Sequence, residues 1–231
     1  MKKKQPIEQS EKNIVAVEEA LGKSEQFIEK NQNLLIGVVA VVILIIAGYI
    51  GFTRFILEPR EQQASAEMFM AEKFFERDSL TLALEGDGAN LGFLDIISEF
   101  RMTRSANLAR YYAGVSLLNL GEYEEAITHL RKFRKRDKFL SAMAYGAMGD
   151  AYLQLEDKSN AVRYYRRAAN TNPNPLTTPA FLMKLGQVYE MKGNHRDALE
   201  AYRTIQRDFP DSNEGRNIER FIARATMAMN L

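Results

Sequence analysis

The longest uninterrupted run of hydrophobic positions is LLIGVVAVVILIIAGYIGF, residues 34–52, which has no polar face. No charged residue lies between Lys30 and Arg54, and thirteen of the nineteen residues are Leu, Ile, Val or Phe. As a helix the run would be about 29 Å long, close to the hydrocarbon thickness of a bilayer. The pattern predicts a transmembrane helix over residues 34–56, with lipid-facing side chains that include Leu34, Leu35, Ile36, Val38, Val42, Leu44, Ile46 and Phe52.

The segments before and after this run are polar. Residues 1–33 form a charged tail with apolar residues at roughly helical spacing, which predicts either amphipathic helices or a partly ordered tail. A cleaved signal peptide would have a shorter apolar region, nearer the start and followed by a small-x-small cleavage site, so a retained anchor fits better. Basic residues flanking the span are nearly balanced, and Lys2, Lys3 and Lys4 favour a cytoplasmic amino terminus with the remaining chain exported.

Residues 58–106 are predicted to form a helical region. A helix is expected over residues 60–77, and one side of it carries the apolar residues Ala64, Met68, Ala71, Phe74 and Phe75. Pro59 has no backbone N–H, so the membrane helix is expected to end or kink there. Residues 81–88 are expected to break the helical pattern because Asp87-Gly88 marks a turn, and residues 91–101 are expected to resume it.

From residue 107 the pattern of small and apolar positions repeats. Gly114, Gly149 and Gly186 are spaced by 35 and 37 residues. Matching offsets after each glycine hold an alanine and then a large residue: Ala126 and Leu130, Ala161 and Tyr165, Ala198 and Tyr202. Each copy predicts two helices joined by a tight turn at Gly121, Glu156 or Gly193, with the small residues allowing close approach. Such pairs cannot bury their apolar faces alone, so they are expected to stack into a solenoid.

These residues resemble the tetratricopeptide repeat, whose pattern is W-x2-L-G-x2-Y followed by A, F and P. The third copy fits it with Leu185, Gly186, Tyr189, Ala198 and Pro210, and the second copy fits with the residues Tyr145, Met148, Gly149, Tyr152, Ala161, Tyr165 and Pro173. The first copy is looser, with Arg110 in the aromatic position and Lys138 in place of proline. The resemblance implies an all-α fold: one transmembrane helix, then a helical-hairpin solenoid of three repeats over residues 107–210.

The regions flanking the repeats are assigned from the same pattern. Residues 58–106 could be a further degenerate repeat. Residues 211–231 are expected to form a capping helix whose inward-facing residues are Ile218, Phe221, Ile222 and Ala225.

In tetratricopeptide proteins the first helices of the repeats line a concave groove, which implies a partner-binding surface here. The groove positions of the family are rich in Leu, Met and Tyr in this chain. The main ones are Leu108, Tyr111, Val115, Leu118, Met143, Asp150, Leu153, Met183, Gln187 and Glu190. The same positions also include Asn119, Gly146, Gln154, Ala180 and Met191. Such a groove would suit a partner helix or an extended segment. Alternatively, the helix at residues 60–77 covers part of it.

Charge and composition narrow the possible functions. The net charge is +1, so gross charge does not point to nucleic acid. The basic run at residues 131–138 could meet acidic lipid head groups or a nucleic acid, but it more simply forms a solvated helix face, with no interleaved aromatic platform expected. The chain has no cysteine and two histidines, His129 and His195, neither with a second ligand at metal spacing. No catalytic residue, cofactor or metal site is predicted, and the chain is not expected to be an enzyme.

The layout of tail, span and repeats resembles the ancillary Sec-translocon subunit (YfgM-like) family of the bacterial inner membrane. That resemblance implies a periplasmic repeat domain that binds translocon subunits and a membrane-anchored prolyl-isomerase chaperone, supporting protein export. Two alternatives remain open: a structural scaffold of another cell-envelope complex, for division or outer-membrane assembly, and a cytoplasm-facing scaffold.

Overall fold

The computed structural model describes residues 29–135 and 137–229 of the chain, and these residues form helices and connecting turns without any strand. The predicted tail lies almost entirely outside the described residues. The chain divides into two units, residues 1–58 and residues 59–231, called here the amino-terminal unit and the repeat unit. Each is described by itself.

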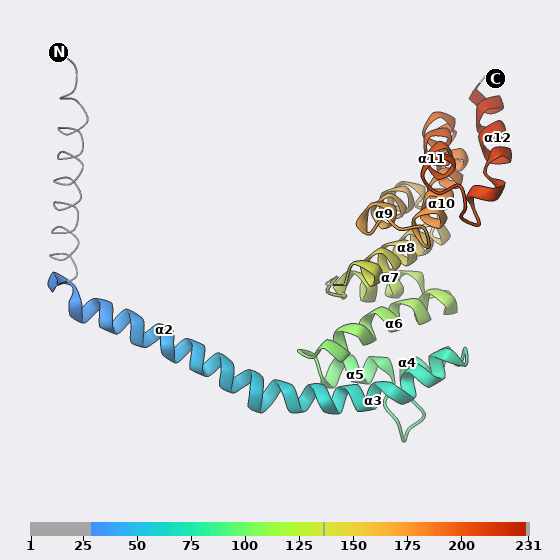
Figure 1. Ribbon diagram of the computed structural model, residues 1–231. Coiled ribbons are helices and arrows are strands. Elements are labelled where there is room, and N and C mark those ends of the chain that lie inside the picture. Colours follow the sequence, from blue (N-terminus) through green and yellow to red (C-terminus); the bar gives the residue numbers. More distant parts are fainter. Residues whose placement is uncertain (1–28, 136, 230–231) are drawn as a thin grey trace, which may run out of the picture. The chain divides into compact units, whose positions relative to one another are not determined.

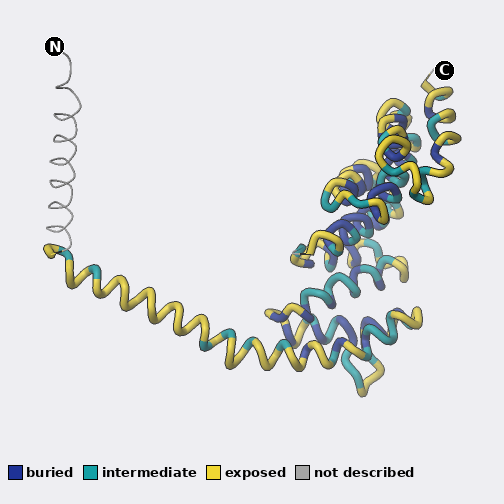
Figure 2. Tube along the Cα trace, viewed as in Figure 1, coloured by how far each residue is buried: buried dark blue, intermediate teal, exposed yellow. Residues whose placement is uncertain are grey.

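The amino-terminal unit contains the helix α2, Gln32–Phe52, in which no residue is buried (Figure 2). Its large apolar side chains are exposed on all sides, for example Leu34 at 65% and Leu44 at 70%. Among the described residues one helix is long and apolar enough to cross a membrane, and its apolar part coincides with the predicted span.

The chain after α2 remains helical, so of the two expected alternatives at Pro59, an end or a kink of the helix, the end is wrong. A π-helical segment, Thr53–Leu57, precedes α3, Glu58–Glu76. The backbone N–H of Glu58 donates to the carbonyl of Thr53, five residues earlier. The Thr53 hydroxyl donates to the carbonyls of Tyr49 and Ile50 at 3.0 and 2.9 Å. A π turn shifts the backbone hydrogen bonds by one residue, which allows the chain to stay helical although Pro59 has no N–H to donate.

Three helices open the repeat unit. The helix α3 buries Ala64, Met68 and Ala71, as its periodicity predicts. The break expected over residues 81–88 is wrong for its first half, because α4, Leu80–Glu85, is helical and buries its apolar side chains. The chain then turns at Gly86, which has a φ of +79°, and continues into α5, Phe93–Glu99, as expected.

Three helical hairpins follow, as the repeat predicts (Figure 1). The first consists of α6, Arg104–Leu120, and α7, Tyr123–Lys132. The second consists of α8, Lys138–Gln154, and α9, Lys158–Thr171. The third consists of α10, Thr178–Met191, and α11, His195–Asp208.

Close approach within each hairpin depends on the helical glycines. A Cβ atom placed on Gly149 would lie 2.6 Å from Cδ1 of Tyr165, and one on Gly186 would lie 2.3 Å from Cε1 of Tyr202. Both tyrosines are fully buried, so their rings fill the space that a larger residue would need. The small residues predicted from the sequence therefore set the spacing of the paired helices.

The carboxyl-terminal segment packs on the last hairpin as a cap. A 3-10 turn, Gly215–Asn217, precedes α12, Glu219–Met229. Ile218 and Ala225 are buried, and Phe221 and Ile222 pack against the same hydrophobic core, as expected. This core extends from α7 to α12, while a second core joins α3, α4 and α5 to α6.

Candidate functional site: the predicted groove and its charged neighbours

The ten predicted groove residues lie on the first helices α6, α8 and α10, and each is half-buried. This intermediate burial follows from their position, because the opposite side of each helix carries the small residues that pack against its partner. Side chains at such positions are held by the core and still reach solvent, which is what a binding surface requires.

Part of the predicted groove forms a hollow of about 320 Å³, here called the α6–α8 hollow. It is lined by Leu118, Asn119, Asp150, Leu153 and Gln154, which the family positions predict, and by Tyr123 of α7. Apolar side chains from two successive repeats therefore share one depression with two amide side chains. Amides can donate and accept hydrogen bonds at once, as an extended peptide backbone also does.

The two acidic groove residues are bound within the chain. Asp150 Oδ1 accepts from the Tyr165 hydroxyl and from Nζ of Lys184, both at 2.6 Å. Glu190 accepts from the Tyr202 hydroxyl at 2.9 Å and from Nε of Arg224 at 2.9 Å. Each carboxylate thus joins the second helix of its own hairpin to the next helix along the stack.

Burial raises the pKa of both tyrosines, and the adjacent carboxylate raises it further. Deprotonation would place a phenolate beside Asp150 or Glu190 in a poorly solvated site. Both hydroxyls consequently remain donors at neutral pH. The hydrogen bond to Glu190 raises the pKa of the Arg224 guanidinium as well, which keeps this cation charged.

The remaining groove residues lie outside the hollow. Leu108 lines a different depression of about 570 Å³, together with Glu61, Phe133 and Leu140. The ring of Tyr111 packs 5.7 Å from that of Phe133, and Val115, Met143 and Met183 also pack on the core. Gln187 is half-buried on α10 and lines neither depression.

The position of α3 bears on whether the groove is covered. The Phe75 ring of α3 lies 5.1 Å from the Tyr112 ring of α6, and the Glu61 carboxylate accepts from the Ser105 N–H and hydroxyl at 3.0 and 2.8 Å. Of the predicted groove residues, Leu108 and Leu118 pack against the core that contains α3. The α6–α8 hollow has no lining residue from α3.

The basic residues have aromatic neighbours from the helix α8. The Arg131 guanidinium donates to the Tyr152 hydroxyl at 3.0 Å, and Arg167 lies 4.2 Å from the centre of the Tyr145 ring. These tyrosines belong to α8 and approach the cations only once the hairpins stack. The sequence of residues 131–138 therefore does not predict these contacts with tyrosines. Most of its cations are exposed, while Lys135 is half-buried and donates to the carbonyls of Leu130 and Phe133.

The two histidines lie on second helices, where His129 and His195 each have a buried Nδ1 without a hydrogen-bond partner in the described chain. Burial, together with nearby Lys132, lowers the pKa of His129. Within residues 29–135 and 137–229 no three His, Cys, Asp or Glu side chains are grouped so that they could hold a metal ion.

Sequence reasoning missed the residues that bind the groove acids, namely Tyr165, Lys184, Tyr202 and Arg224. One signal was available. The family pattern places a phenylalanine where Tyr165 and Tyr202 stand, and the added hydroxyl in a buried position requires a hydrogen-bond partner.

Comparison with known proteins agrees with this architecture. Residues 111–175 and 147–213 match the tetratricopeptide repeat family. A curated relative, the uncharacterized protein ycf37 of Guillardia theta, is 29% identical over 121 residues, which cover 51% of this chain. The matched segment spans 66% of the length of that relative.

Two solved structures of the protein MamA have the same fold. Their TM-scores are 0.52 and 0.51, at 21% and 20% sequence identity. The matches cover 72% and 69% of this chain and 88% and 94% of those structures. Likeness at this level of identity speaks for the fold alone. Residues 111–213, which the family model matches, therefore carry tetratricopeptide-type repeats, and the two structures support a helical solenoid as the fold.

Proposed function

We propose that this protein is a membrane-anchored adaptor that holds a partner protein in its repeat groove. The α2 helix serves as the anchor, since its apolar side chains are exposed along its whole length. The observation that carries the binding role is the α6–α8 hollow, which gathers five residues from the groove positions of two successive repeats.

The chemistry of the hollow favours an extended segment of a partner protein. Leu118 and Leu153 offer apolar contact to one side chain of such a segment. The exposed amides of Asn119 and Gln154 occupy equivalent positions one repeat apart, so they can hydrogen-bond successive backbone groups. Asp150 is already engaged by Tyr165 and Lys184, which favours a partner segment without strong net charge.

The layout of tail, span and repeats supports a proposal for the partner and the location. We propose that the repeat unit is periplasmic and binds a Sec-translocon subunit or a membrane-anchored prolyl-isomerase chaperone during protein export. This step is supported by the resemblance of the layout to the ancillary translocon subunits, and it is independent of the fold comparisons.

The groove is tested by a matched pair of leucine substitutions. Leu153→Glu places a charge in the hollow, whereas Leu176→Glu makes the same change at a side chain that is 75% exposed in a connecting loop. We expect Leu153→Glu to lower co-purification of translocon subunits and the chaperone at least tenfold, with Leu176→Glu equal to the native protein. Circular dichroism on both variants checks that the helices persist. Equal recovery of the partners with Leu153→Glu would remove the hollow as their binding site.

The orientation is tested by labelling, which is clean because the chain contains no cysteine. Leu176→Cys in the repeat unit and Ser24→Cys in the tail are treated separately in intact cells with a maleimide that crosses the outer but not the inner membrane. We expect labelling at position 176 alone. Labelling at position 24 alone would show a cytoplasm-facing repeat unit and exclude the periplasmic proposal.

A further inference from the structure

A second surface of the repeat unit consists of two turns that lie beside one another. The turn between α5 and α6 carries Arg101, Met102 and Arg104, and the segment from the end of α7 into α8 carries Arg134, Lys138 and Phe139. Met102, Arg104 and Arg134 line the same depression of about 570 Å³. The Asn107 side chain fixes the two turns together, accepting from the Arg134 N–H at 2.7 Å and donating to its carbonyl at 3.2 Å. We call these six residues the basic face.

The cations of the basic face are available to a partner. Arg101, Arg104, Arg134 and Lys138 are all exposed, and no ion pair is found for them among the described residues. Two nearby carboxylates are engaged elsewhere. Glu61 accepts from backbone N–H groups at the start of α6, and Asp137 accepts from the Leu140 N–H at 2.7 Å. Glu99 is a third, exposed acid, and since all three carboxylates keep their negative charge, the four cations exceed them by one.

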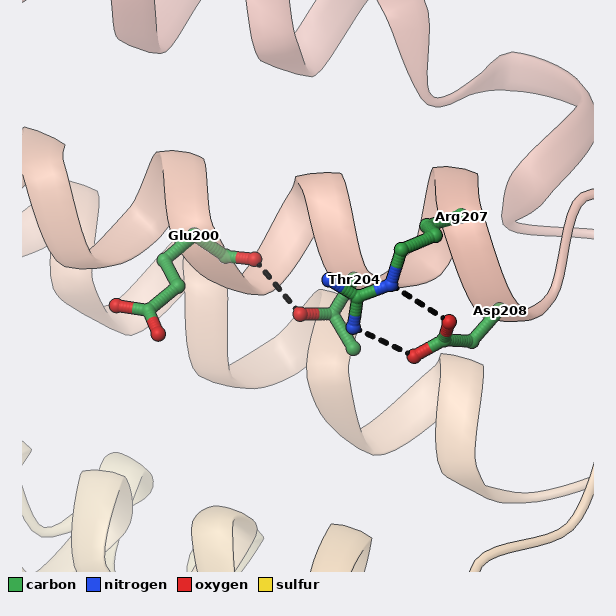
Figure 3. A network of polar contacts seen from close by, with 4 residues as sticks. All are labelled: Glu200, Thr204, Arg207 and Asp208. Carbon is green, nitrogen blue, oxygen red and sulfur yellow. Dashed lines mark hydrogen bonds and ion pairs between the residues drawn. The ribbon is translucent and has the colours of Figure 1, made fainter.

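The corresponding end of the third hairpin shows a different arrangement. There Arg207 donates to both carboxylate oxygens of Asp208, at 2.7 and 2.8 Å (Figure 3). This pair cancels the charge at the end of α11. The ends of the first and third hairpins therefore differ in charge, although α9 carries exposed cations of its own, Arg163, Arg166 and Arg167.

The basic face also carries apolar side chains beside its cations. Met102 is 63% exposed and lies between Arg101 and Arg104, and Phe139 is 41% exposed and follows Lys138. Cations flanking exposed apolar side chains are typical of surfaces that bind at the boundary of lipid head groups and acyl chains.

The covalent link to α2 decides between an anionic membrane and other anionic partners. The Arg60 guanidinium donates to the Glu99 carbonyl, and the Glu61 carboxylate accepts from the Arg104 and Ser105 N–H groups. The basic face is thus bonded to residues that come eight and nine positions after Phe52, the last residue of α2. At about 1.5 Å per helical residue, nine positions correspond to roughly 14 Å of chain, so a short segment links the anchor to the two residues that bind the basic face.

We propose that the basic face docks on anionic phospholipid head groups of the bilayer that holds α2. This inference rests on the proposed membrane anchoring and is independent of the groove. Docking would fix how the repeat unit presents its hollow to partners in the same membrane. Because each exposed arginine or lysine near an anionic surface changes such an equilibrium about fivefold, loss of two should weaken docking about 25-fold.

The full chain reconstituted in lipid nanodiscs tests the proposal. An environment-sensitive fluorophore is attached to Met102→Cys, or to Glu124→Cys on the exposed start of α7 as the control. With phosphatidylglycerol present we expect a blue shift and stronger emission at position 102 only. The change should disappear in pure phosphatidylcholine and weaken in high salt, as screening requires. No difference between the two lipids at position 102 would overturn the proposal.

Charge-reversal variants sharpen the test. We expect Arg101→Glu combined with Arg134→Glu to abolish the blue shift, and Lys158→Glu combined with Arg196→Glu, on exposed surfaces elsewhere, to leave it unchanged. Equal loss in both pairs would indicate a general charge effect and overturn the proposal. A response at position 102 to added oligonucleotide, without one to phosphatidylglycerol, would overturn it in favour of a nucleic acid.

Failure of the anchoring is recognised separately. The reconstituted chain is washed with alkaline carbonate before the fluorescence measurement, and release from the lipid would contradict the membrane anchor itself. A chain that stays in the lipid without a blue shift contradicts the docking alone.

Discussion

The first repeat and the two later repeats share one backbone plan but differ in what joins their helices. In the first, Gly114 faces Leu130, and the groove residues Val115 and Leu118 have no polar group. In the later repeats the residue facing the glycine is Tyr165 or Tyr202, and its hydroxyl binds a groove carboxylate. The later repeats therefore add directional hydrogen bonds to the packing that all three possess.

Because of this difference, the later repeats are held together by hydrogen bonds in the groove, whereas the groove residues of the first repeat have no such bonds within the described chain. The carboxylates Asp150 and Glu190 each join three helices, so their groove positions are occupied by internal partners. Leu118 has no such partner, and the α6–α8 hollow lies where it faces the second repeat. We infer that the boundary of the first and second repeats provides the free binding surface, while the third repeat and α12 form the stiff end.

The largest expected effect comes from filling the glycine positions. In Gly186→Ala the new Cβ meets the fully buried ring of Tyr202, so we expect a loss of about 3 kcal/mol in unfolding free energy. In Gly114→Ala it meets the Leu130 side chain, also fully buried, 2.5 Å from Cγ; because a leucine can change rotamer and has no hydrogen bond to keep, we expect about 1 kcal/mol. Urea titration followed by circular dichroism measures both.

The control for this pair is Gly48→Ala in α2, where the new Cβ has nothing within 4 Å and no loss is expected. Equal losses for Gly114→Ala and Gly186→Ala would mean that the tyrosine rings are no more rigid than the leucine. The proposed difference between the repeats would then be wrong.

The next largest effect is expected at alkaline pH, where the two buried tyrosines of the later repeats should make stability depend on pH. The fold raises the pKa of Tyr165 and Tyr202 above the usual value of about 10. In that range the unfolded chain releases the two protons while the folded chain retains them, so stability falls as pH rises above about 10. We expect Tyr165→Phe combined with Tyr202→Phe to flatten this fall, in melting temperatures measured from neutral to alkaline pH. Tyr123→Phe is the control, and an equally steep fall in the double variant would contradict the pKa shifts.

The sequence predicted those parts of the molecule that depend on local pattern. Gly149, Ala161 and Tyr165 recur at fixed offsets, so the hairpins and their glycine contacts could be derived before the structure was known. The helix α4 could not, because burial of Ala83 and Leu84 depends on a core shared with α3, α5 and α6. Packing in that core outweighs the turn signal of the Asp-Gly pair that follows.

The candidate site was predicted in the same uneven way. Family positions placed Leu118, Asp150 and Leu153 on one surface, and the structure gathers them in the α6–α8 hollow. The family positions could not show that the Asp150 carboxylate binds Lys184, because Lys184 lies 34 residues further along the chain. That pairing depends on how one hairpin stacks on the next, which a repeat pattern alone does not specify.

Removing the cations that bind the groove acids should have a moderate effect that differs between the two sites. The Glu190 side chain is 15% exposed, whereas that of Asp150 is 33% exposed. We expect Arg224→Ala to cost about 1 kcal/mol and to increase amide hydrogen exchange throughout α12, and Lys184→Ala to cost about 0.5 kcal/mol or less. Unchanged exchange in α12 after Arg224→Ala would show that hydrophobic packing of Ile218 and Ala225 suffices to hold the cap.

The last comparison concerns the hairpin turns, where the second repeat departs from the other two. Gly121, Glu156 and Gly193 have φ angles of +90°, +60° and +74°. The three turns make the same backbone hydrogen bonds. In the second turn the Glu156 N–H donates to the Leu153 carbonyl at 3.0 Å and the Asp157 N–H donates to the Tyr152 carbonyl at 2.9 Å. A residue with a Cβ is strained by about 1 kcal/mol or more in this left-handed conformation, and glycine is not.

Glu156→Gly should therefore stabilise the repeat unit, by about 0.5 kcal/mol once the greater freedom of glycine in the unfolded chain is subtracted. Gly121→Ala and Gly193→Ala make the opposite exchange in the same conformation and should each destabilise it by about 1 kcal/mol. Thermal melting of the three variants side by side gives the sign directly. A loss of stability in Glu156→Gly would mean that the Glu156 side chain contributes more to the second repeat than its backbone strain removes.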